Sequence, residues 1–341
     1  MAHMTLEQKI GQHFMGHIPR AGLNPALLAD IGRGLYGGFI LYPWNYTDDA
    51  GVRSLTSSLE HAASEASPPI DLFISVDQEG GRVAAFRFPD FVQFPPQFTM
   101  GRYGDAELGW AEGYIVGVEL RSLGINMNFA PVLGLYPKAD STIIGDRSYG
   151  PDPQKVAAIG KAYILGAEAS GIIPVAKHFP GHGAAHMDSH YDLPIVELSE
   201  RRLLDNDIVP FKAAVDVGVE AIMTAHVLFP KVDPSFPATL SDVFLKQILR
   251  KELGFNGLII SDGLSMGALK KHYSLTETLE RAFDAGVDIL LANAEYDVPA
   301  LVVQTEALVR SGKIPLATVN DGTRRILELK LRHGLLTHPA Y

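Results

Sequence analysis

Short apolar runs alternate with longer amphipathic segments along the whole chain. Eight of these runs have the length and the β-branched content of strands: residues 13–18, 37–42, 72–77, 125–130, 172–177, 221–226, 257–262 and 286–291. Stretches such as GLII and AIM are apolar at every position, as expected for strands of a parallel sheet buried on both faces. The pattern therefore predicts eight parallel strands.

The segments between the runs predict helices, and the clearest of these begins near residue 274. Ser274 and Glu277 have the spacing of a capping box, apolar residues follow at helical intervals, and Gly286 ends the pattern. Eight strands with intervening helices and no linker predict a single (β/α)₈ TIM-like barrel over residues 1–341. A doubly wound sheet is the alternative. The long connections 78–124 and 131–171 and the loop after residue 177 are expected to be functional.

Polar side chains stand where several of the predicted strands end. They are Asp77, Asn128, Lys177 with His178, His226 and Asp262. Each alone also fits a hydrogen-bonded polar residue at a strand end. Because the carboxyl ends of barrel strands share one face, and that face carries the active site of barrel enzymes, the set together predicts a site there.

The segment HFPGHGAAHMDSH, residues 178–190, contains a histidine at every fourth position: His178, His182, His186 and His190. On a helix this spacing would align them as metal ligands. Pro180 and the neighbouring glycines disfavour a helix, so the segment is predicted to be a loop in which the spacing has no geometric meaning. A metal-dependent hydrolase that uses some of these histidines with Asp188 stays open as the minority interpretation.

Two acidic positions suit catalysis. Asp188 and His190 are two residues apart and can approach each other in a turn, where a carboxylate orients an imidazole for general acid/base work. A solvated loop with a local hydrogen bond explains the same pair. Asp262 directly follows a buried strand, which suits a nucleophile, a metal ligand or a helix cap.

Composition narrows the partners and the location. The 341 residues are 47% hydrophobic and carry a formal net charge of −10 without a basic cluster, so we expect no nucleic-acid partner. No cysteine is present, which is compatible with the cytoplasm, and no apolar run approaches the ~20 residues that span a membrane. Residues 1–3 have the character of an expression scar before Met4. We expect a cytoplasmic monomer, and if Met4 is the native start the chain carries no export signal.

Several motifs together resemble one family. SVDQEGGRV, NFAPVLGL, IIGDRSYG, AKHFPGHG with DSH, IMTAHVLFP and SDGLSMGAL follow one another up to about residue 292. They are similar to the family 3 glycoside hydrolases, and most of all to the bacterial β-N-acetylglucosaminidases (β-hexosaminidases) of the peptidoglycan-recycling type. The resemblance implies a (β/α)₈-like barrel that hydrolyses terminal non-reducing β-linked N-acetylglucosamine with retention, on muropeptides or chitooligosaccharides.

The resemblance also implies roles for individual residues. Asp262 corresponds to the nucleophile that forms a covalent glycosyl intermediate, His190 to the acid/base and Asp188 to its partner. The residues that correspond to those holding the sugar hydroxyls are Asp77, Arg147, Lys177 and His178. The resemblance requires neither a metal nor an organic cofactor.

The chain departs from the family pattern at two positions. Ala85 stands where an arginine is usual, with Arg87 as the nearest alternative guanidinium, and Gly263 replaces an acidic residue of the recycling enzymes. Four functions other than the β-N-acetylglucosaminidase stay open. They are an N-acetylglucosaminide phosphorylase, another exo-β-glycosidase of the same family, the metal-dependent hydrolase, and a catalytically silent sugar-binding barrel.

Overall fold

The eight predicted runs form the strands of a closed parallel barrel. A computed structural model describes residues 1, 3–136, 144–182, 185, 187–293 and 295–336. The barrel strands are β1 (Phe14–His17), β2 (Gly38–Ile40), β3 (Phe73–Val76), β6 (Met127–Asn128), β7 (Ile173–Phe179), β8 (Ala221–Thr224), β9 (Leu258–Gly263) and β10 (Ile289–Leu291). Their order around the barrel is β1-β10-β9-β8-β7-β6-β3-β2, and β1 pairs with both β2 and β10 to close it. The predicted barrel is confirmed, and the doubly wound alternative is wrong.

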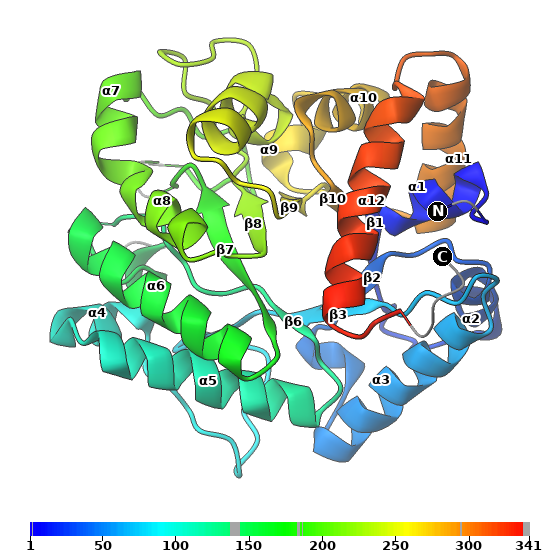
Figure 1. The fold of residues 1–341 in the computed structure, drawn as a ribbon, viewed down its shortest axis with the longest axis horizontal. Helices are drawn as coiled ribbons and strands as arrows, with labels where there is room; N and C mark the ends of the chain where they lie inside the picture. The colour runs from blue at the N-terminus through cyan, green and yellow to red at the C-terminus, as the bar shows by residue number, and fades with distance from the viewer. Residues whose placement is uncertain (2, 137–143, 183–184, 186, 294, 337–341) are drawn as a thin grey trace.

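Helices surround the barrel (Figure 1). The longer ones are α1 (Leu6–Gln12), α2 (Pro25–Gly32), α3 (Asp49–Ser64), α4 (Gln97–Tyr103), α5 (Ala106–Ser122), α6 (Pro153–Ala169), α8 (Val209–Asp216), η5 (Val243–Glu252), α10 (Leu275–Ala285), α11 (Val298–Arg310) and α12 (Leu316–Arg332). The short ones are η1 (Pro43–Asn45), η2 (Gly145–Arg147), α7 (Glu200–Arg202), η3 (Leu203–Asp207), η4 (Ala238–Leu240) and α9 (Gly267–Lys270). Figure 1 shows α5 and α6 packed side by side on one flank. No helix in the described ranges is both long and apolar enough to cross a bilayer.

The ends of α10 follow from its sequence. The Ser274 side chain accepts a hydrogen bond from the backbone N–H of Glu277, and Gly286 adopts a left-handed conformation with φ of 94° at the carboxyl end. Glycine reaches this conformation without the steric cost that a Cβ atom adds. The local signals therefore set the boundaries of this helix before any tertiary contact is considered.

A two-stranded hairpin that the hydrophobic pattern did not reveal follows β3. It pairs β4 (Gln78–Gly80) with β5 (Val83–Ala84). The turn between them needs glycine, because Gly81 has φ of 57° and a Cβ atom there would lie 2.7 Å from the Cα atom of Pro96. The hairpin places Glu79 directly beyond the carboxyl end of β3.

The core forms two layers. Alternate strand residues such as Met15, Phe73 and Ile260 fill the barrel interior, and a larger cluster lies between the strands and the helices. Ile326 of α12 belongs to the interior cluster, and the Lys330 ammonium donates hydrogen bonds to Gln12 and Gly37 at the start of β1 and β2. Because α12 covers the amino ends of the strands, the carboxyl ends are left to form a site.

Candidate active site

A cavity of about 330 Å³ opens at the carboxyl ends of the barrel strands. Six of the seven predicted site residues line it: Asp77, Arg147, Lys177, His178, His190 and Asp262. The seventh, Asp188, contacts His190 from the same loop. The wall also contains Ile40, Tyr42, Val83, Phe129, Met223, Gly263, Met266, Leu291 and Asn293. The barrel therefore brings together residues from β2, β3, β6, β7, β8, β9 and β10 or from the loops that follow them.

A chain of four charged side chains crosses the floor of this cavity. Arg147 donates two hydrogen bonds to Glu79, with distances of 2.8 Å and 2.7 Å. The Lys177 ammonium lies 2.6 Å from Oε1 of Glu79, which also accepts from Arg147, and 2.5 Å from Asp77. The side chains of Glu79 and Lys177 are only 1% and 2% exposed. Buried charges are stable only when they are paired in this way.

The pKa values of Glu79 and Lys177 show that both side chains keep their charges inside the protein. Burial alone would raise the pKa of Glu79, but the charges and hydrogen bonds of Arg147 and Lys177 outweigh it and lower that pKa to about 2. Burial alone would lower the pKa of Lys177, but Asp77 and Glu79 raise it. Glu79 and Lys177 therefore stay ionised at neutral pH and help to present a fixed polar surface to a ligand.

His178 follows Lys177 on β7 and faces the predicted nucleophile. Its Nε2 atom lies 3.9 Å from Oδ2 of Asp262, and its side chain is buried. Burial, followed by the positive charges of Lys177 and Arg147, lowers the pKa of His178 well below its usual value. A neutral imidazole at this position offers one hydrogen bond and no charge.

Asp262 lies on β9 with one carboxylate oxygen held and the other facing the cavity. Oδ1 accepts a hydrogen bond of 2.7 Å from the backbone N–H of Gly263. A Cβ atom at Gly263 would lie 2.7 Å from Nδ2 of Asn293, so the side chain of Asn293, two residues beyond β10, occupies the space that a larger residue at 263 would need. This contact explains why glycine stands at that position in this chain.

Asp188 and His190 form the predicted pair. Oδ1 of Asp188 lies 2.7 Å from Nδ1 of His190 and also accepts from the His190 backbone N–H at 2.9 Å. Burial would raise the pKa of Asp188, but these hydrogen bonds and the imidazole lower it. The backbone N–H of Gly267 donates to the His190 carbonyl, which ties the loop to the start of α9. The contact is made through Nδ1, and the imidazole is 66% exposed.

Three of the polar residues singled out from the sequence have structural partners instead. Asn128 bonds the backbone of Gln78 and the hydroxyl of Tyr163. His226 bonds Thr239 and the carbonyl of Gly263, and so supports β9 from below the cavity. His182 is buried and bonds Ser189 within the dyad loop. His186 lies outside the described residues.

Two further points raised by the sequence are a metal site and the position of Arg87. Within the ranges that the structure describes, no group of three or more His, Cys, Asp or Glu side chains is placed to hold a metal ion. Arg87 donates a hydrogen bond to the carbonyl of Gly81 and is not among the residues lining the cavity. The replacement of the missing family arginine by Arg87 stays a prediction.

The sequence reasoning missed Glu79, Tyr42 and Asn293. Glu79 and Asn293 stand two residues after predicted strands and Tyr42 is the last residue of one, and that position was the available signal. Glu79 was overlooked because nothing in a single sequence shows that a carboxylate beside two glycines is buried. Its contact with Arg147 spans 68 residues of chain.

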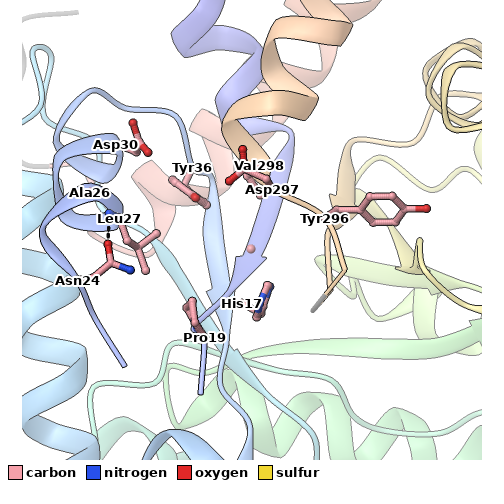
Figure 2. Close-up of a pocket in the computed structure, with 11 residues that line it drawn as sticks. His17, Pro19, Asn24, Ala26, Leu27, Asp30, Tyr36, Tyr296, Asp297 and Val298 are labelled. Atoms are coloured by element: carbon pink, nitrogen blue, oxygen red, sulfur yellow. Dashed lines mark hydrogen bonds between the residues drawn. The ribbon is translucent and has the colours of Figure 1, made fainter. Parts of the chain in front are cut away.

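A second, smaller cavity of about 180 Å³ lies between α2, the end of β1 and the start of α11 (Figure 2). Its polar lining includes Asp30, Asp297, Tyr36 and His17. Burial, with Asp297 and Asp30 nearby, raises the pKa of Tyr36. None of the seven predicted site residues lines this cavity, so the larger cavity is the candidate active site.

The fold and the site together define a class of protein. A parallel barrel whose carboxyl end presents one free carboxylate oxygen, an Asp–His pair and a fixed set of charges has the equipment of an enzyme that transfers a glycosyl group.

Comparison with known proteins identifies the family. The glycosyl hydrolase family 3 N-terminal domain matches residues 5–329. A β-hexosaminidase of Nitrosospira multiformis is 37% identical over 299 residues, which cover 82% of this chain and 83% of the relative. The chain belongs to glycosyl hydrolase family 3, and it is a glycoside hydrolase.

Solved structures agree with this assignment. A family 3 β-N-acetylglucosaminidase from Paenibacillus sp. str. FPU-7 superposes with a TM-score of 0.90 at 38% identity, and the match covers 99% of this chain. This chain spans only 64% of that longer protein. A β-N-acetylhexosaminidase from Beutenbergia cavernae matches with a TM-score of 0.88 at 29% identity, and the match covers 97% of this chain and 99% of that one.

Proposed function

We propose that this chain is a retaining exo-β-N-acetylglucosaminidase, which removes terminal non-reducing β-linked N-acetylglucosamine. The observation that carries the proposal is one cavity lined by both Asp262 and His190, with Asp188 bonded to the imidazole. The relatives named as β-hexosaminidases support the choice of sugar. We further propose that the barrel acts as a single catalytic domain.

In the first half-reaction Oδ2 of Asp262 attacks the anomeric carbon, because Oδ1 is held by the Gly263 N–H. The bond from that carbon to the leaving oxygen breaks, and the leaving oxygen takes a proton from Nε2 of His190. Nδ1 of His190 remains hydrogen-bonded to Asp188, whose negative charge stabilises the protonated imidazole. The product is a glycosyl ester of Asp262 and a free aglycone.

In the second half-reaction water replaces the aglycone. Nε2 of His190, now unprotonated, accepts a proton from the water as its oxygen attacks the same carbon. The ester bond breaks and Asp262 recovers its carboxylate. Two inversions at one carbon give net retention, and His190 ends the cycle protonated as it began.

Four residues are proposed to hold the sugar ring: Asp77, Arg147, Lys177 and His178. Asp77, Arg147 and Lys177 are held by ion pairs within the protein before any ligand arrives, so they need not reorganise as the ring flattens. An array of this kind stabilises a transition state more than a flexible one would. Because α12 and the interior cluster fill the barrel beneath them, the ring that occupies this position is terminal.

The decisive test is to trap the intermediate. A fluorinated N-acetylglucosaminide with a good leaving group should label the protein with one glycosyl unit, and peptide mass analysis should place it on Asp262. Asp262→Gly should remove nearly all turnover and all labelling while circular dichroism stays that of the wild type. A label on another residue, or an active Asp262→Gly variant, would refute the assignment.

Phosphorolysis is the second candidate, because a neutral or cationic histidine in place of a second carboxylate leaves less negative charge facing phosphate. Initial rates on aryl β-glycosides with and without inorganic phosphate, with the product anomers followed by NMR, separate the two reactions. Hydrolysis gives the free β-anomer at an unchanged rate when phosphate is added. A phosphate-dependent rate and a sugar 1-phosphate would establish the alternative.

The biological setting completes the proposal. We propose muropeptides or chitooligosaccharides as natural substrates, with a place in peptidoglycan recycling, and a monomeric cytoplasmic protein. The absence of cysteine supports the location, because cytoplasmic proteins have no need of disulfides. Sedimentation equilibrium tests the monomer, and fractionation of the source cells tests the compartment.

A further inference from the structure

An aromatic stack extends the wall of the cavity outward at the end of β2. Tyr42 lines the cavity, close enough to Asp77 and Asp262 that both raise its pKa after burial has done so. The ring of Trp44 lies parallel to that of Tyr42, with centroids 4.4 Å apart, and Trp44 is 38% exposed. The stack therefore runs from the sugar position toward the surface.

A guanidinium covers the outer face of this stack. The Cζ atom of Arg20 lies 4.5 Å from the centroid of the Trp44 ring. Since Tyr42 occupies one face of Trp44 at 4.4 Å, Arg20 must occupy the other. Arg20 directly follows Pro19, which Figure 2 shows on the segment after β1. Stacking on an aromatic face orients a guanidinium and leaves its N–H groups at the edge free to donate.

Within the residues that the structure describes, the Arg20 guanidinium contacts the ring of Trp44 and forms no hydrogen bond or ion pair. The two cations inside the cavity differ from it. Arg147 is committed to Glu79, and Lys177 to Glu79 and Asp77. With Asp262 included, the three carboxylates outnumber these two cations, in a protein of net charge −10. An anionic group bound beside this cavity therefore needs a cation from elsewhere. Arg20 lies at the outer end of the Tyr42–Trp44 stack and, in the part of the chain that the structure describes, is not paired with a carboxylate.

We propose that Arg20, oriented by Trp44, binds a carboxylate on the aglycone, so that this rim favours acidic aglycones over neutral ones. The inference rests on the proposed function and narrows its substrate class. An N-acetylmuramic acid aglycone carries a carboxylate on its lactyl ether, whereas the second sugar of a chitin fragment is neutral. The guanidinium matches a carboxylate with two parallel N–H donors.

The test compares two disaccharides that differ in that group: N-acetylglucosamine β-1,4-linked to N-acetylmuramic acid, and N,N′-diacetylchitobiose. The measured quantity is the ratio of their kcat/KM values. Arg20→Gln should lower the ratio of acidic to neutral substrate about tenfold, the effect of one charge-assisted hydrogen bond. Trp44→Ala, which removes the platform, should lower the ratio as well. Rising salt should lower the wild-type ratio and leave that of Arg20→Gln nearly constant.

A matched control removes one positive charge elsewhere. Arg102→Gln on α4 changes an exposed arginine outside the cavity and should leave the ratio at its wild-type value. A ratio unchanged by Arg20→Gln, or both substrates slowed by the same factor, would overturn the proposal. Arg20 would then have only a structural role in the segment after β1. An aryl β-N-acetylglucosaminide reports on the proposed function separately. If the wild type does not cleave it, the hydrolase assignment has failed rather than the aglycone inference alone.

Discussion

Glu79 offers the sharpest test of how the site is held together, because it contacts both cations and is itself fully buried. We predict that Glu79→Gln destabilises the protein even though the side-chain shape is preserved. In the wild type the pKa of Glu79 falls from 4.5 to about 2, since Arg147 and Lys177 outweigh the effect of burial. That difference corresponds to about 3 kcal/mol of stability at neutral pH. Loss of one partner from a buried ion pair has a similar cost of about 3–5 kcal/mol.

The contribution of Glu79 to the free energy of unfolding depends on pH. Because the folded pKa is lower than the unfolded one, the contribution is complete above about pH 4.5 and is lost as the pH falls toward 2. The deficit of Glu79→Gln relative to the wild type should therefore be about 3 kcal/mol near pH 7 and shrink to about 2 kcal/mol near pH 3.5.

Urea unfolding followed by far-UV circular dichroism at both pH values measures the deficit. Glu252→Gln is the control, because Glu252 is an exposed glutamate on η5 and its substitution should change stability by no more than about 0.5 kcal/mol. A Glu79→Gln variant as stable as this control near pH 7 would refute the reasoning, as would a deficit that stays constant on acidification. Either result would mean that Glu79 is not the anchor of Arg147 and Lys177.

Three further outcomes are expected. His190→Ala should lose about 10²–10⁴ in rate on a β-linked disaccharide and far less on an activated aryl glycoside, with a burst and partial rescue by azide on the latter. The control, His61→Ala on α3, should behave as the wild type. Equal losses on both substrates would show that His190 does not transfer the proton. Asp188→Asn should shift the pH–rate profile while the fold is retained, because the imidazole loses a charged partner 2.7 Å away; an unchanged profile would leave Asp188 a purely structural role. Dialysis against a chelator should leave activity unchanged, and a loss that zinc alone restores would favour the metal-dependent hydrolase.

The relation between Asp188 and His190 shows what short-range sequence information can reach. Residues two apart in a turn cannot separate far, so the pairing of this carboxylate and imidazole was predictable without a fold. The boundary of α10 at Gly286 was predictable for the same reason, since a helix end depends on a few neighbouring dihedral angles. The barrel itself followed from eight short apolar runs separated by helical segments, of which stretches such as GLII are apolar throughout, as strands covered on both faces are.

Which polar side chains meet, and which charges they keep, depended on barrel closure. Asp77 and Lys177 are 100 residues apart in sequence, yet the strands and the hairpin after β3 bring them within 2.5 Å. Asn128 and His226 stand at strand ends in the same pattern and are used instead to hold backbone and neighbouring side chains. The position at a strand end was local information that the sequence determined by itself. Side chains become buried only when distant segments pack together and exclude water. The ion pairs of Glu79 and the neutral state of His178 both depend on that burial, so only the tertiary structure decided them.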